Sequence, residues 1–255
     1  QPTWTRVDLR QELTGDPAAP LSLLDPHLIP ASVARLESVG WIKNVRHVQK
    51  SVSGLSIDVA YRQPVAAVEL NDNTVPHWNR SPTQMPIDSS GLLMPPESMP
   101  ASNGLLISMF HAIGNAEQHP QFIAGLRPYS QWPDARVADA AAIAAWLQAD
   151  AAAMGLKRIV TFRYAEKPND VAVPYELWTS IGQNGPQFIW GNPPGGEQFN
   201  EAQPAVKLAA LRSWFAAHGD GTGEQVVDLR TGTAVIVGKS QPSQDRQSRA
   251  PLKLK

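Results

Sequence analysis

The sequence predicts an α+β fold, in which a small module is followed by a larger, strand-rich domain. Segments with alternating apolar and polar residues, the period of a strand, are more numerous than segments with a helical period. Three segments have the helical period, residues 28–39, 134–155 and 204–218, and groups of predicted strands separate them. Because strands and helices do not alternate one by one, the parallel sheet of an α/β protein is not expected.

The first module is expected at residues 1–72 and should resemble a βαββ unit. Its predicted elements are a strand, a helix, two strands that form a hairpin, and a further strand: residues 4–10, 28–39, 41–48, 55–59 and 65–70. A Ser-Val-Ser-Gly turn joins the two hairpin strands, and the polar, proline-bearing residues 71–86 predict a domain boundary.

A larger, mixed or antiparallel β domain is expected at residues 73–239. Residues 85–94 predict a strand, a tight turn and a returning strand, and the apolar residues 104–114 could form either a helix or a strand. Further strands are predicted at residues 157–164, 175–181 and 187–190, and a closing hairpin at residues 224–230 and 233–238. Residues 240–255 are polar and basic and are expected to form a disordered tail.

The two helices of this domain are expected to bury one apolar face each. The alanine-rich helix over residues 134–155 should end at Gly155 and bury Trp146 among other apolar residues. The apolar face predicted for the helix over residues 204–218 consists of Val206, Leu208, Leu211, Trp214 and Phe215. Most of the eight tryptophans are therefore assigned to the core, rather than to carbohydrate stacking.

Composition excludes several classes of function. The 255 residues include 22 basic and 23 acidic side chains, a net charge of −1, so nucleic acid is not expected as a partner. The chain has no cysteine, which excludes disulfides, thiolate metal sites and cysteine nucleophiles. No stretch approaches the roughly 20 apolar residues that cross a bilayer.

No pattern in the sequence predicts catalytic, cofactor-binding or metal-binding residues. The six histidines have no compact ligand spacing, and neither a GxSxG nor an SxxK motif occurs. The acidic residues form no close pair in an aromatic setting that would indicate a glycosidase. The glycine clusters at residues 195–196 and 219–223 lack the strand, helix and lysine of a phosphate-binding loop. We therefore expect a non-enzymatic protein.

Three groups of residues, in order, resemble the extracytoplasmic part of the FtsQ/DivIB family of bacterial cell-division proteins. The first resembles the helix and strands that end the family's POTRA module, the second its entry into the β domain, and the third its last helix and closing strands. They are residues 34–48 with 55–66, residues 86–94, and residues 207–211 with 226–238. Each motif is weak alone, but their shared order makes the resemblance specific.

The resemblance implies a scaffold of the division machinery without enzymatic activity or a cofactor. Members of the family help to control septal peptidoglycan synthesis through the partner proteins FtsB and FtsL. The resemblance also implies an anchor in the inner membrane. A single transmembrane segment would precede residue 1, and the present residues would lie on the periplasmic side.

The resemblance further implies a binding site on the edge of the last strand, where a partner strand is added to the sheet. The matching residues are Arg230, Thr231, Thr233, Ala234, Val235, Ile236, Val237 and Gly238. Alternate side chains such as Thr233, Val235 and Val237 would give selectivity, and Arg230 would pair with a partner carboxylate. The family's aromatic anchors fall on Thr231 and Lys239 here.

Three alternatives remain open at this point. Residues 224–238 could be an uneventful terminal hairpin with a solvated Arg230. The tryptophan content would suit a cell-envelope enzyme that processes carbohydrate or peptidoglycan, which needs paired carboxylates across a cleft. A POTRA-bearing factor for outer-membrane assembly or secretion would need tandem POTRA copies or a barrel.

Overall fold

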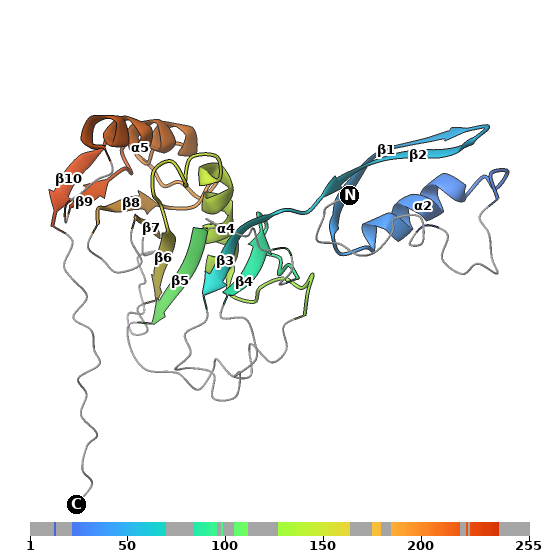
Figure 1. The fold of residues 1–255 in the computed structure, drawn as a ribbon, viewed down its shortest axis with the longest axis horizontal. Helices are drawn as coiled ribbons and strands as arrows, with labels where there is room; N and C mark the ends of the chain where they lie inside the picture. The colour runs from blue at the N-terminus through green and yellow to red at the C-terminus, as the bar shows by residue number, and fades with distance from the viewer. Residues whose placement is uncertain are drawn as a thin grey trace, which may run out of the picture.

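The computed structural model describes Leu13 and residues 22–69, 84–95, 98, 105–111, 127–163, 175–179, 185–219, 223 and 225–239. In Figure 1 these residues form two groups, a helix with a long hairpin and a large sheet with two helices. The fold is therefore α+β, as the sequence predicted. The strand expected at residues 4–10, the boundary expected at residue 72 and the tail expected at residues 240–255 lie outside the described residues.

The smaller group consists of helix α2 (Leu28–Glu37) and the antiparallel strands β1 (Ile42–Ser51) and β2 (Gly54–Tyr61). Leu36, Val39, Trp41 and Ile42 form its buried cluster. The Trp41 ring stacks on Tyr61 with the ring centroids 5.6 Å apart. The predicted helix and hairpin are both present, because their apolar faces pack against each other.

The larger group contains an eight-stranded mixed sheet in the order β10-β9-β8-β7-β6-β5-β3-β4. Its strands are β3 (Pro64–Glu69), β4 (Gln84–Asp88), β5 (Leu105–His111), β6 (Arg158–Arg163), β7 (Tyr175–Trp178), β8 (Gln187–Gly191), β9 (Val226–Asp228) and β10 (Val235–Gly238). Residues 104–114 thus contribute a strand, not a helix. β3, which the sequence placed in the first module, pairs with β4 and β5 of this sheet.

Helices α4 (Ala135–Leu147) and α5 (Pro204–His218) lie on the same face of the sheet (Figure 1) and share one apolar core with it. The prediction that the helix starting at residue 134 extends to Gly155 is wrong, because α4 ends at Leu147. The amides of Asp150 and Ala151 both donate to the Leu147 carbonyl, so the chain tightens into turns after Leu147. The assignment of Trp146 to the core is also wrong, since this side chain is 43% exposed and lies off the buried face of α4.

One row of aligned apolar side chains crosses all eight strands on the face that the helices cover. From β4 to β10 it contains Met85, Val68, Ile107, Ile159, Leu177, Phe188, Val227 and Ile236. The first seven belong to the core or pack against it, whereas Ile236 is 52% exposed. The core therefore continues to the β10 edge but is not closed there.

A buried ion pair joins the two groups of elements. Arg62, just after β2, donates from Nη1 to Asp88 Oδ2 at 2.6 Å and from Nε to the Gly40 carbonyl oxygen at 3.0 Å. The Tyr129 ring lies directly against Gly40, where any Cβ atom would overlap it. The helix–hairpin group is thus attached to the β4 side of the sheet by specific polar and aromatic contacts.

Candidate docking edge

The two edges of the large sheet differ in what covers them. β4 is covered by its own chain, because Met94 N donates to the Pro86 carbonyl at 2.8 Å and Asp88 N donates to the Leu92 carbonyl at 3.0 Å. The covering segment is paired in turn, since Tyr129 N donates to the Leu93 carbonyl at 2.7 Å. At the other edge β10 pairs with β9, and no second strand lies beside it among the described residues.

The structure brings the eight predicted site residues together in one turn and one short strand. Only Val235–Gly238 pairs with β9, while residues 230–234 form the connection between the two strands. The prediction that the strand includes Thr233 is therefore wrong. Val235, Ile236 and Val237 are 47%, 52% and 55% exposed, whereas Ala234 is partly buried against the core. Strand addition on this edge is limited to residues 235–238.

The two faces of β10 have different neighbours. Ile236 is aligned with Val227 and shares the helix-covered face of the sheet. Val235 is aligned with Asp228, so its side chain lies on the opposite face. The side chain of this strand that continues the core is therefore Ile236, whereas Val235, one of the residues predicted to give selectivity, lies on the opposite face.

Arg230 is held by a carboxylate of its own chain. Its Nη2 donates to Asp228 Oδ2 at 2.7 Å, its Nε donates to Asp228 Oδ1 at 3.1 Å, and its amide donates to Oδ1 at 2.9 Å. Burial opposes ionisation of Asp228, but these bonds outweigh burial and hold the pKa of its carboxyl below the ordinary value. Arg230 Nη1 makes no hydrogen bond with a described residue, and the side chain is 48% exposed. A partner carboxylate could reach Nη1 while Asp228 keeps the guanidinium oriented.

The turn before β10 lies against the start of α5. Gly232 has φ 81°, and a Cβ atom placed on it would lie 2.7 Å from Val206 Cγ1 and 3.0 Å from Ala202 Cβ. Ala202 N donates to the Arg230 carbonyl at 2.7 Å. The prediction that Val206 is buried is wrong, because this side chain is 49% exposed beside the turn. The start of α5 thus adds an exposed apolar side chain next to the open edge.

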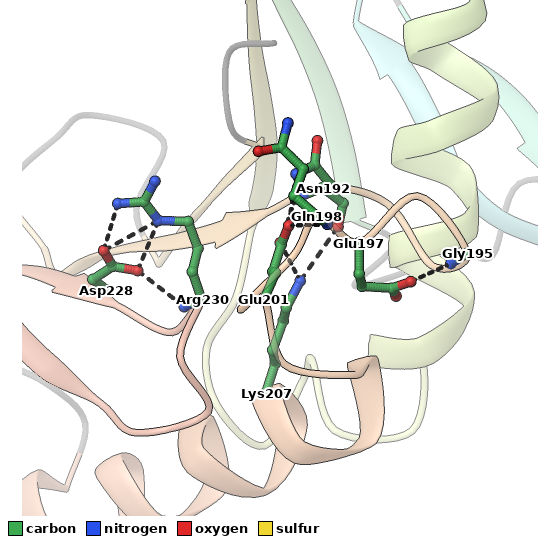
Figure 2. Close-up of polar contacts among 8 residues, drawn as sticks. All are labelled: Asn192, Gly195, Glu197, Gln198, Glu201, Lys207, Asp228 and Arg230. Carbon is green, nitrogen blue, oxygen red and sulfur yellow. Dashed lines mark hydrogen bonds and ion pairs between the residues drawn. The ribbon is translucent and has the colours of Figure 1, made fainter. Parts of the chain in front are cut away.

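A buried polar cluster, consisting of Asn192, Glu201 and Lys207, fixes the loop between β8 and α5 (Figure 2). Lys207 is fully buried and donates to Glu201 Oε1 at 2.6 Å, with Nζ 5.3 Å from the Trp190 ring centroid. Glu201 also accepts from Asn192 N at 2.7 Å and Asn192 Nδ2 at 2.6 Å. Burial opposes ionisation of Glu201, but the bonds from Asn192 and Lys207 hold its pKa below the ordinary value.

The buried cluster also lies close to the turn before β10, at Arg230. A Cβ atom on Gly191, the last residue of β8, would overlap Glu201 Oε1 and lie 2.8 Å from Arg230 Cγ. The stem of Arg230 therefore packs where the buried carboxylate approaches the strand. This arrangement orients the loop between β8 and α5, the start of α5 and the turn at residues 230–234 relative to one another.

Sequence reasoning missed the roles of Asn192, Glu201 and Lys207. Lys207 stands between two apolar residues of a predicted helix, and its partner lies six residues earlier, before the helix begins, so no periodic pattern connects them. The Asp228–Arg230 pair could have been found, since the strand predicted at residues 224–230 places these two oppositely charged residues on the same face.

The described residues contain no group of three or more His, Cys, Asp or Glu side chains that could hold a metal ion. None of the helices in the described part is long and apolar enough to cross a membrane. No model of a known protein family matches the chain, and a search of curated proteins finds no match. The geometry of the β10 edge and the motifs in the sequence are therefore the observations that bear on function.

Proposed function

We propose that this chain is a non-enzymatic scaffold that binds an extended segment of a partner protein along β10, as a ninth strand of the sheet. The observation that carries the proposal is the β10 edge. It has one neighbouring strand among the described residues, and its three apolar side chains are about half exposed. An edge of this kind offers backbone donors and acceptors to an incoming strand.

The short length of β10 limits what backbone pairing alone can contribute. Only Val235–Gly238 is paired with β9, and the register shifts between Ile236 and Gly238. Each ladder hydrogen bond contributes about 0.5–1.5 kcal/mol net, so a few such bonds give weak binding. Side-chain contacts with Ile236, Val206 and Arg230 must therefore contribute to a stable complex.

We propose further that the partner belongs to bacterial cell division. The motifs in residues 34–48 with 55–66, 86–94, and 207–211 with 226–238 support this, because they follow the order of the FtsQ/DivIB family along the chain. On this proposal the chain binds FtsB- and FtsL-like proteins at the outer side of the inner membrane and helps to control septal peptidoglycan synthesis.

The test measures capture of the extracytoplasmic fragments of the FtsB-like and FtsL-like proteins encoded in the same genome. Capture by the native chain is compared with capture by Val235→Pro and Ile236→Pro. Successive amides of a strand point to opposite edges, so one variant removes a donor that faces the partner and the other weakens pairing with β9.

We expect one proline variant to lose at least tenfold in affinity while its melting temperature stays close to that of the native chain. Unchanged capture by both variants would reject docking at β10. Capture of neither fragment by the native chain would reject the division partners.

A further inference from the structure

The apolar row across the sheet constrains which segment can dock. Seven strands each contribute one residue to the row that belongs to the core or packs against it, and the eighth contributes Ile236. A ninth strand would place one side chain directly beside Ile236 on the same face, because directly opposed residues of paired strands share a face. That side chain would extend the row by one position.

The surroundings of this ninth position are apolar. The Val206 side chain is 49% exposed and lies beside Gly232, which stands three residues before β10. Ala234, the residue just before β10, packs against the core. The turn that leads into β10 packs at Gly232 against Val206 and Ala202, so the start of α5 lies close to the first residues of β10. A polar side chain at the ninth position would lose water without gaining a hydrogen-bond partner among these residues.

The opposite face has a different chemistry. Val235 is aligned with Asp228, whose carboxylate is paired with the half-exposed Arg230. Glu176 and Ile189 precede Asp228 in the same row. Polar side chains of a docked segment can be hydrated or paired on this face, so it does not demand an apolar residue.

On the basis of the proposed function, we infer that the docked segment is amphipathic. It carries an apolar side chain opposite Ile236, near Val206, and polar side chains at the alternate positions, on the face of the sheet that carries Val235 and the Asp228–Arg230 pair. A separate extended segment suits this edge better than a second copy of the chain. Pairing along four residues is too short to hold two folded copies, whereas a segment can continue from β10 onto Val206.

The inference can be tested with a phage-displayed library of linear 12-residue peptides, selected on the full native chain. The selected peptides are then measured against Val235→Pro, Ile236→Pro, Val206→Glu and Ile236→Thr. Val206 is the third residue of α5, where a glutamate suits the helix, and threonine keeps the β-branched shape of Ile236. Val52→Glu, at the fully exposed tip of the β1–β2 hairpin, is the matched control.

We expect peptides that bind the native chain, lose binding to one proline variant and share apolar residues at alternate positions. Val206→Glu and Ile236→Thr should each weaken their binding at least tenfold, and Val52→Glu should leave it unchanged. Melting temperatures establish that the variants are folded.

The remaining outcomes separate this inference from the proposed function. If no peptide is sensitive to either proline variant, docking at β10 fails and the inference fails with it. If peptides are sensitive to proline but indifferent to Val206→Glu and Ile236→Thr, docking stands and the amphipathic segment is rejected. If sedimentation shows native dimers that Ile236→Thr dissociates, a second copy occupies the edge and the inference is overturned.

Discussion

The two edge strands of the eight-stranded sheet, β4 and β10, both have backbone groups on their outer side that no strand of the sheet pairs, but only β4 is covered by its own chain. β4 is paired on its outer side by residues 92–94, and Asp88 stabilises the turn that brings this segment back. β10 has no such cover among the described residues, although it is built from three strongly apolar residues. Sheet edges in soluble proteins are normally covered, charged or interrupted. This contrast between the two edges is the observation behind the proposed docking at β10.

An ion pair lies near each edge, and the two pairs stabilise different parts of the structure. At the β4 edge Arg62 and Asp88 connect the edge to the helix–hairpin group. Near the β10 edge Glu201 and Lys207 fix the loop before α5, and Ala202 N joins this loop to the Arg230 carbonyl in the turn before β10. One buried pair therefore fixes the junction of two groups of elements, and the other fixes the surroundings of an open strand. Disrupting each pair separately tests this division.

The largest effect is expected from Glu201→Ala. The substitution leaves Lys207 fully buried without its carboxylate and removes the acceptor of Asn192 N and Nδ2. Breaking a buried ion pair from one side reduces the free energy of unfolding by about 3–5 kcal/mol. Urea unfolding followed by circular dichroism measures this loss.

Lys207→Met is the control for that substitution. Methionine fills the space with an apolar chain, and Glu201 keeps its hydrogen bonds from Asn192 and Gln198, so we expect a smaller loss. If both variants lose the same free energy of unfolding, the loss comes mainly from the missing ion pair and not from leaving Lys207 buried without a partner carboxylate.

The next largest effect is expected from Asp88→Ala at the covered edge. Asp88 is 2% exposed and accepts from Arg62, from the amide and hydroxyl of Ser90, and from Leu92 N. Arg62 is 19% exposed and can reach water after the change, so we expect a loss of about 2–4 kcal/mol in the free energy of unfolding. A loss below about 1 kcal/mol would contradict the role of this carboxylate at the junction.

The pH dependence of the Asp88 effect has a defined sign. Burial opposes ionisation, but hydrogen bonds from Ser90, Arg62 and Leu92 hold the pKa of Asp88 below its ordinary value of 3.8. Between the two pKa values the unfolded chain binds more protons, so stability rises with pH. The difference between the native chain and Asp88→Ala should therefore be full near pH 6 and shrink as the pH falls below 3.8 and through the lowered pKa.

The sequence could predict elements with a local pattern, but not the pairing of strands and ions that are distant or irregular in sequence. Periodicity located the β1–β2 hairpin and α5, because each has one apolar face that packs locally, and its alternation also located β9 and β10, although β10 is exposed. It could not show that β3 joins the large sheet, since strand partners distant in sequence leave no local pattern. It placed Val206 in the core and overlooked Lys207, because a buried lysine is recognised only through its partner Glu201.

A smaller effect is expected from Gly232→Ala in the turn that precedes β10. Alanine is strained at φ 81°, and its Cβ would press on Val206 Cγ1 at 2.7 Å. We expect a loss of about 1–3 kcal/mol in the free energy of unfolding. Gly195→Ala is a matched control, because Gly195 has φ 85° and open space around a Cβ atom. Equal losses at both positions would show that Val206 does not press on the turn.

The smallest effect on stability is expected from Ile236→Thr, at the open end of the apolar row. Ile236 is 52% exposed, so replacing it changes the free energy of unfolding by only about 0.5–1 kcal/mol. Val227→Thr, one strand inward in the same row, places a hydroxyl on a fully buried side chain and should lose about 1–3 kcal/mol. Unfolding in urea measures both variants. Because threonine suits a strand in either position, the difference between them reports how far the core is closed. If Ile236→Thr were as destabilising as Val227→Thr, the β10 edge would already be covered within the free chain, and the contrast with β4 would disappear.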